Sequence, residues 1–152
     1  MIFICAAMPS VNYLNLNCKY PTVNQPTISL EQIRTLCLPQ YGQYEGRDRF
    51  DWSELFPAVE RLVVSVNSKS QIQFLIYQFK TILSGSFTSD GYPMRENTPI
   101  TRYWLEKHLH RSRGNSIKNF VCQINRRCFS FSLHLWIGED NDCHQPLPMA
   151  CD

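Results

Sequence analysis

The stretch NFVCQINRRCFSFSLHLWI, residues 119–137, predicts two β-strands joined by a short turn. Its second half alternates between apolar and polar positions, which is typical of a strand with one buried face. The polar residues Asn125, Arg126 and Arg127 separate this strand, at 128–137, from a first arm at 119–124. We therefore expect a β-hairpin. Its second arm turns five apolar side chains toward the core, namely Phe129, Phe131, Leu133, Leu135 and Ile137.

Three helices are predicted upstream of this hairpin. The main one covers 69–84, where Ser68-x-x-Gln71 has the form of a capping box and apolar residues follow at helical spacing up to Gly85. A shorter helix is expected at 29–37, before Pro39. Another is expected at 99–110, where Pro99 suits the first helical turn. The main helix has the widest apolar stripe, so we expect it to be the central core helix.

The remaining segments complete the predicted fold. Strands are expected near 11–18 and 61–66, a single helical turn at 51–56 and a long loop at 84–98. We find no internal repeat. The expected fold class is α+β: a single domain over 1–137, with an antiparallel sheet, the main helix packed on one face and two shorter helices. An acidic, loosely attached C-terminal tail is expected over 138–152.

Length and composition exclude several classes of protein. The chain has 152 residues, of which 43% are apolar and 18% charged, so it is a globular rather than a disordered chain. No apolar run approaches the roughly 20 residues that a transmembrane helix needs. The six glycines form neither Gly-x-Gly-x-x-Gly nor Gly-x₄-Gly-Lys, which argues against the common nucleotide-binding loops.

The charge distribution provides the main functional signal. The formal net charge is only +2, but positive residues concentrate between positions 101 and 128, and the last 24 residues contain acidic residues without Lys or Arg. Clustered cations attract phosphate backbones and acidic surfaces. The candidate anion- or nucleic-acid-binding residues are Arg102, Lys107, Arg111, Arg113, Lys118, Arg126 and Arg127. We call these residues the basic band. Tyr103 and Trp104 share helical spacing with Ile100, so core packing is expected for both rings.

The seven cysteines are odd in number and scattered, unlike a secreted disulfide framework. We therefore predict reduced thiols and an intracellular location, cytoplasmic or nuclear. Cys122 and Cys128 are too far apart for a zinc knuckle, and adjacent residues such as Cys143 and His144 rarely ligate one ion. Neither a metal nor another cofactor is expected.

These observations favour a non-enzymatic binding module that engages RNA or an acidic protein surface through residues 102–127. An anionic membrane surface would fit the same band. One alternative is a small Cys/His-dependent hydrolase or transferase that uses some of the four histidines and seven cysteines. A second alternative is a self-associating structural protein, hence a homo-oligomer. The content of cysteine, aromatic residues and asparagine is typical of a small viral accessory or matrix-like protein.

Overall fold

The computed structural model describes residues 10–16, 29–43, 51–90, 99–113, 119–127 and 130–138. These residues form β-strands, α-helices and one short 3₁₀ helix. In order they are β1 (Tyr13–Asn15), β2 (Thr35–Leu38), η1 (Tyr41–Gln43), α2 (Trp52–Leu55), β3 (Arg61–Ser65), α3 (Lys69–Gln78), β4 (Ser84–Asp90), α4 (Arg102–Arg113), β5 (Asn119–Arg127) and β6 (Ser130–Gly138).

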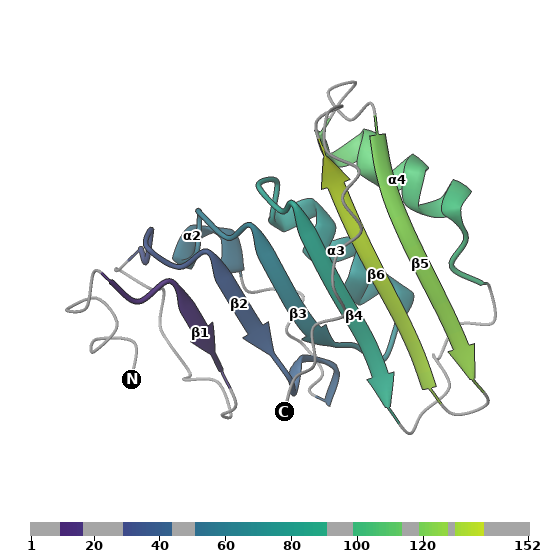
Figure 1. Cartoon of the computed structure of the whole chain (residues 1–152), viewed down its shortest axis with the longest axis horizontal. Coiled ribbons are helices and arrows are strands. Elements are labelled where there is room, and N and C mark those ends of the chain that lie inside the picture. Colours follow the sequence, from purple (N-terminus) through teal and green to yellow (C-terminus); the bar gives the residue numbers. More distant parts are fainter. Residues whose placement is uncertain are drawn as a thin grey trace.

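The strands form one mixed sheet, and the helices lie together on one of its faces (Figure 1). The spatial order is β1-β2-β3-β4-β6-β5. The first four strands are parallel, whereas β6 is antiparallel to both β4 and β5. Between the sheet and the helices lies one core, whose largest fully buried side chains include Trp52, Tyr41, Phe56, Phe79 and Phe87. The fold is a two-layer α/β domain.

The parallel half of the sheet is an internal repeat. Tyr13, Thr35, Arg61 and Ser84 occupy one register position, so successive units start 22, 26 and 23 residues apart. Each unit carries the same pattern around its strand: Val11-x-x-Leu14-x-Leu16, Ile33-x-x-Leu36-x-Leu38, Val59-x-x-Leu62-x-Val64 and Ile82-x-x-Gly85-x-Phe87. Strand order follows chain order, so the four units stack as in a solenoid.

The backbone hydrogen bonds repeat with the same period. Two successive N–H groups of each unit donate to one carbonyl oxygen of the unit before it. These bonds run from Arg34 and Thr35 to Asn12 (2.8 and 2.9 Å), from Glu60 and Arg61 to Arg34 (both 2.9 Å), and from Leu83 and Ser84 to Glu60 (2.8 and 3.0 Å). The equivalent carbonyl of the fourth unit, that of Leu83, instead accepts from Ile137 of antiparallel β6 at 2.8 Å. The β5–β6 hairpin therefore ends the array.

The fourth unit departs from the pattern at one buried position. Leu14, Leu36 and Leu62 are replaced there by Gly85, and the ring of Phe87 fills the space. A Cβ at position 85 would stand 2.7 Å from Phe87 Cε2, closer than real Cβ atoms come to a neighbour. Phe87 is fully buried, so its ring has little room to move. Glycine at 85 and phenylalanine at 87 therefore depend on each other.

Two predicted elements were wrong, and with them the fold class. Residues 29–37 do not form a helix, because 35–38 is the parallel strand β2, and residues 84–90 are the strand β4 instead of the start of a loop. The sheet is mixed and mostly parallel rather than antiparallel, so the class is α/β and not α+β. The three-residue spacing that precedes each strand, as in Leu30, Ile33 and Leu36, mimics a helix because it agrees with the helical period. Because β2 and β4 were not predicted as strands, the repeat of the four parallel units was not recognised in the sequence either.

Other predictions are confirmed. The hairpin is antiparallel as expected, and the strands near 11–18 and 61–66 correspond to β1 and β3. The predicted turn was wrong, because Asn125, Arg126 and Arg127 lie in β5 and continue its pairing with β6. Helix α3 begins at the predicted cap, where Ser68 Oγ accepts from Gln71 N at 3.3 Å, but the helix ends at Gln78, and Gly85 lies in β4. Residues 52–55 form the expected single turn. The predicted tail was 138–152, but Gly138 is the last residue of β6, and 139–152 lie outside the described residues.

Candidate functional site

The described part of the basic band lies on α4 and on the adjacent strand β5. Helix α4 starts after Thr101, whose hydroxyl accepts a hydrogen bond from the backbone N–H of Trp104 at 3.2 Å. Leu105 and Leu109, one turn apart, are fully buried, which fixes the face of α4 that contacts the core. Tyr103 is 76% exposed, so the expectation that its ring packs in the core was wrong. Trp104 is half-buried against the core.

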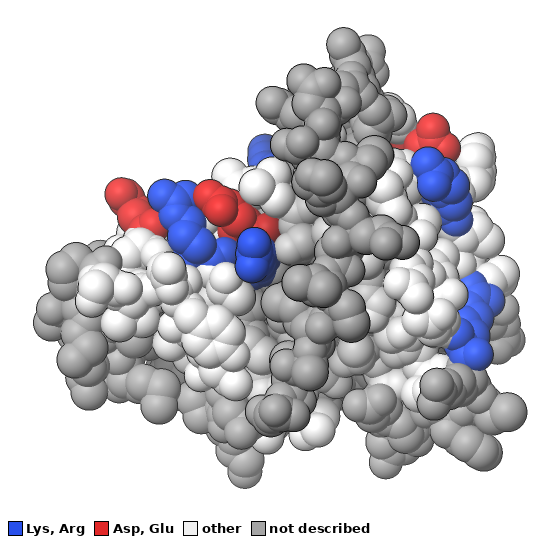
Figure 2. Space-filling model, viewed as in Figure 1, with Lys and Arg blue, Asp and Glu red and all other residues white. Residues whose placement is uncertain are grey.

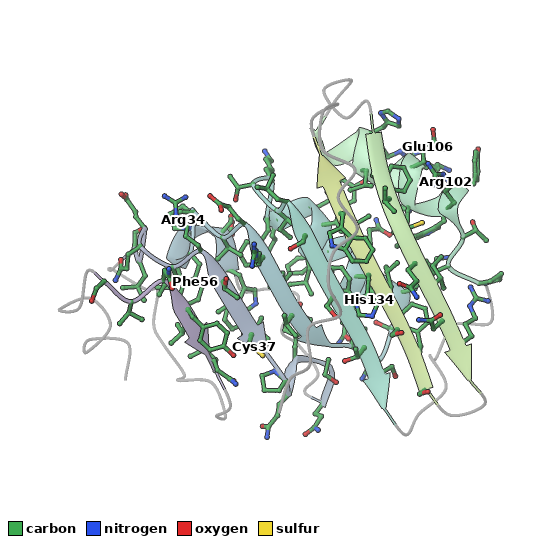
Figure 3. The ribbon with its side chains drawn as sticks, viewed as in Figure 1. Arg34, Cys37, Phe56, Arg102, Glu106 and His134 are labelled. Carbon is green, nitrogen blue, oxygen red and sulfur yellow. The ribbon has the colours of Figure 1, made fainter. Side chains whose placement is uncertain are left out.

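Two arginines of the band connect α4 to β5. The Arg102 guanidinium lies 4.8 Å from the centre of the Phe120 ring and donates to the Phe120 carbonyl oxygen at 3.4 Å. Arg126 donates to the carbonyl oxygen of Ile100, just before the helix. Arg102 and Glu106, one helical turn apart, lie together at the outer edge of the molecule beyond β5 (Figure 3). Both arginines are exposed but already make bonds within the fold.

A second group of cations lies on the α3 side of α4. Lys107 and Arg111 are one turn apart and exposed. Lys69, the first residue of α3, places its Nζ 4.9 Å from the centre of the Trp104 ring. We call Lys69, Lys107 and Arg111 the cationic cluster. Lys69 was absent from the basic band because it precedes α4 by more than thirty residues, and the sequence gives no sign that the two helices touch.

A buried histidine, His108, lies between α4 and α3, near the residues of the cationic cluster. The His108 ring centre lies 4.4 Å from that of Trp104, and His108 Nδ1 lies 3.4 Å from the Tyr77 hydroxyl. The pKa of His108 is lowered, first by burial and then by the positive charges of Arg111, Lys107 and Lys69. This ring is therefore neutral at neutral pH and serves as packing between α3 and α4. The nearby His110 instead faces Glu106, with His110 Nε2 3.9 Å from the carboxylate.

Three members of the basic band are not fully described. Arg113 is the last residue of α4 and Arg127 the last of β5, and their side chains lie outside the described part. Lys118 lies outside the described residues altogether. The four described side chains thus form two groups, Lys107 with Arg111 and Arg102 with Arg126. In Figure 2, which shows the sheet face opposite the helices, charged residues gather toward the two ends of the face.

A serine–histidine pair occupies that opposite face. Ser86 Oγ lies 3.2 Å from His134 Nδ1, and the Trp136 ring stacks on His134 with centres 6.1 Å apart. A hydrolase would also need two further features. One is a group that orients the histidine, and the other is a set of N–H donors that stabilises an oxyanion. In the register, His134 lies between Ser86 and Gln123, and the N–H groups of these inner strands serve the sheet ladder. The pair therefore resembles a cross-strand hydrogen bond more than a catalytic dyad.

The described cysteine thiols, and the described side chains that could bind a metal, do not lie in a known site geometry. No disulfide is seen between the described cysteines Cys37 and Cys122, and in the register they lie opposite Val63 and Leu135 instead of a histidine. The remaining cysteines lie outside the described residues. Within the described ranges, no group of three His, Cys, Asp or Glu side chains is placed to hold a metal ion.

Comparison with known proteins does not assign this arrangement. Neither the protein-family models, nor the curated proteins, nor the solved structures include a match to the chain. None of the helices in the described part of the chain has the length and apolar character of a membrane span.

Proposed function

We propose that this chain is a non-enzymatic binding module that contacts an acidic protein surface through the outward side of α4. The observation that carries this proposal is a row of three side chains one helical turn apart. Tyr103, at 76% exposure, is followed by exposed Lys107 and Arg111. Tyrosine and arginine are enriched at the centres of protein interfaces, where a large ring and a charged fork contribute much of the binding energy.

The architecture supports a binding role over a catalytic one. Open α/β sheets bind small molecules at the point where strand order reverses, because neighbouring loops diverge there and leave a crevice. Strands β1 to β4 instead proceed in a single direction, with the helices on one face. Stacked repeats of this kind present extended surfaces to macromolecular partners.

The placement of the arginines favours a protein partner over RNA. Affinity for RNA depends on the number of phosphates that Lys and Arg neutralise. Arg102 and Arg126 already donate to backbone carbonyl oxygens, which limits their reach toward a phosphate backbone. Binding to an acidic protein needs fewer cations than binding to RNA, since an exposed aromatic side chain such as Tyr103 supplies part of the contact.

Fluorescence anisotropy tests this proposal with two labelled probes, a 20-residue polyglutamate and a 20-nucleotide oligouridylate. We expect the full chain to bind polyglutamate. The double variant Lys107→Glu and Arg111→Glu should weaken binding at least about tenfold, because it reverses two contacting charges. Exposed Lys80, just after α3, provides the matched control Lys80→Glu, which should bind as the original chain does. Tighter binding of oligouridylate, with a steep loss in salt, would contradict the proposal in favour of RNA, and binding of neither probe would refute it.

The alternatives predict other signals. A Cys/His-dependent enzyme has one thiol that reacts with a maleimide far faster than the rest at neutral pH, because a catalytic thiolate has a lowered pKa. A self-associating structural protein sediments as an oligomer even at high salt, since apolar contacts resist screening. The binding module predicts uniformly slow thiols and a monomer at high salt.

A further inference from the structure

Strand β5 forms one edge of the sheet, next to α4 (Figure 1). It has nine residues, contains no proline and pairs with β6 at nine consecutive positions without a bulge. The strand at the opposite edge, β1, has only three residues. Proteins usually protect an edge by a short strand, a bulge or a proline, because its unpaired N–H and C=O groups attract another strand. Strand β5 has none of these three protections.

Two hydrogen bonds show which backbone groups of β5 face outward. Ile137 lies opposite Phe120 in the register but donates its N–H away from β5, to the chain just before β4. This pair therefore exchanges no hydrogen bond, and the Phe120 carbonyl oxygen points outward, where it accepts from Arg102. Such pairs alternate along an antiparallel ladder, so the N–H and C=O groups of Cys122 and Ile124 also point outward. They offer two donors and two acceptors to a further strand.

An arginine lies near each end of this segment. The Arg102 guanidinium, from α4, lies over the Phe120 ring, and exposed Arg126 donates to a carbonyl oxygen just before α4. A guanidinium has five N–H donors, so one internal bond leaves others for a ligand. Glu106, which lies beside Arg102 (Figure 3), has its carboxylate 3.9 Å from His110 Nε2. A strand added to β5 would therefore meet an arginine at each end.

The positions of these arginines disfavour a second copy of β5 as the added strand. Two copies would pair antiparallel with the Cys122 of each opposite the Ile124 of the other. In that register, Arg126 of each copy lies opposite Phe120 of the other and next to the Arg102 that covers it. The two-fold symmetry thus brings like charges together at both ends, which lowers stability. A segment with a carboxylate at each of these positions is instead attracted by the same arginines.

We infer that an extended segment of the acidic partner adds to β5 as an antiparallel strand. This inference rests on the proposed function, and the segment continues the contact that begins on α4. Backbone hydrogen bonds supply affinity in such strand addition, and alternate side chains supply specificity. The residues opposite Cys122 and Ile124 are apolar, because both of these side chains pack against the core. Two positions beyond them on either side, acidic side chains reach Arg102 and Arg126, so the acids lie six positions apart on one face.

NMR titration of the full chain with capped heptapeptides tests this pattern. Glu-Thr-Val-Thr-Val-Thr-Glu has both glutamates and both valines on one face, and the control Glu-Thr-Val-Thr-Val-Glu-Thr has one glutamate on the other face. The first peptide should bind about tenfold more tightly, because a charge-assisted hydrogen bond contributes about that factor. N-methylation of both valines removes the N–H groups that face β5 and should abolish binding. N-methylation of the central threonine, whose N–H faces away, should preserve it.

Hydrogen exchange locates the added strand. The amides of Cys122 and Ile124 should exchange fast in the free chain, whereas those of Val121 and Gln123, which face β6, should exchange slowly. The first peptide should slow exchange at Cys122 and Ile124. Slow exchange there in the free chain would show that the edge is already covered, and would overturn the inference.

The peptides also separate this inference from the proposed function. Equal affinity of the two heptapeptides, unchanged exchange at Cys122 and Ile124, or sensitivity to methylation at threonine instead of valine would overturn strand addition. Failure of the heptapeptides to bind would do the same. In each of these cases, binding of polyglutamate that depends on Lys107 and Arg111 keeps the proposed function standing. Binding of neither polyglutamate nor the heptapeptides would overturn both.

Discussion

Gly85 and Phe87 allow a sharp test of the repeat, because the first occupies a leucine position and the second fills the missing volume. Gly85→Ala places a Cβ 2.7 Å from Phe87 Cε2 inside the core. Overpacking of this kind costs about 1–3 kcal/mol. Replacing glycine by alanine in a strand also raises the free energy of unfolding by about 0.5–1 kcal/mol, because alanine lowers the conformational entropy of the unfolded chain. From the middle of each range, we expect Gly85→Ala to lower the free energy of unfolding by about 1 kcal/mol.

The sign should reverse when the ring is removed. Phe87→Leu destabilises the chain by itself because it leaves a cavity. In that background, however, Gly85→Ala meets no ring and should raise stability by about 0.5–1 kcal/mol. Urea unfolding of the four chains, followed by far-ultraviolet circular dichroism, gives the coupling energy, expected at about 2 kcal/mol. Additive effects, or a Gly85→Ala variant as stable as the original, would refute the reasoning that the two positions share one volume.

Three further predictions concern the helices. Ser68→Ala should cost about 1 kcal/mol in urea unfolding because the cap of α3 is lost, whereas Gln73→Ala, further along the same helix, should change stability by a few tenths. His108 has a lowered pKa in the folded chain, so below pH 6.5 the unfolded chain binds more protons. Stability should then be complete above that pH and should decline as pH falls toward the folded-state pKa, and His108→Gln should flatten this slope in pH-dependent melting. Arg126→Leu removes the bond to the Ile100 carbonyl and should speed hydrogen exchange of the first turn of α4, and unchanged exchange would show that this bond does not hold the helix.

Much of the secondary structure was predictable because it depends on local periodicity. The second arm of the hairpin, residues 129–137, has apolar residues at every second position, and α3 has both a cap and a wide apolar stripe. Strand β2 was missed because it spans only four residues after apolar residues at helical spacing, and β4 because Ser84, Gly85 and Ser86 resemble a loop. Parallel pairing joins residues more than twenty positions apart, which local patterns do not report.

The candidate site was predictable only in part, for a similar reason. Charge clustering indicated α4, and Lys107 and Arg111 are exposed on it. The contribution of Lys69 depends on the contact between α3 and α4, and the use of Arg102 and Arg126 for internal bonds depends on the position of β5. Only tertiary structure decides which cations of a basic segment stay available to a partner.

The strands lengthen steadily across the sheet, from three residues in β1 through four, five and seven to nine in β6 and β5. The longest ladder belongs to β5 and β6, which a ribosome makes after the four parallel strands. Emerging β1, β2 and β3 therefore have the least cross-strand bonding to hold them, and we expect them to stay unfolded until the hairpin leaves the exit tunnel. For this chain, synthesis and folding would proceed in opposite directions, and the apolar side chains of the early strands would stay exposed in the interval.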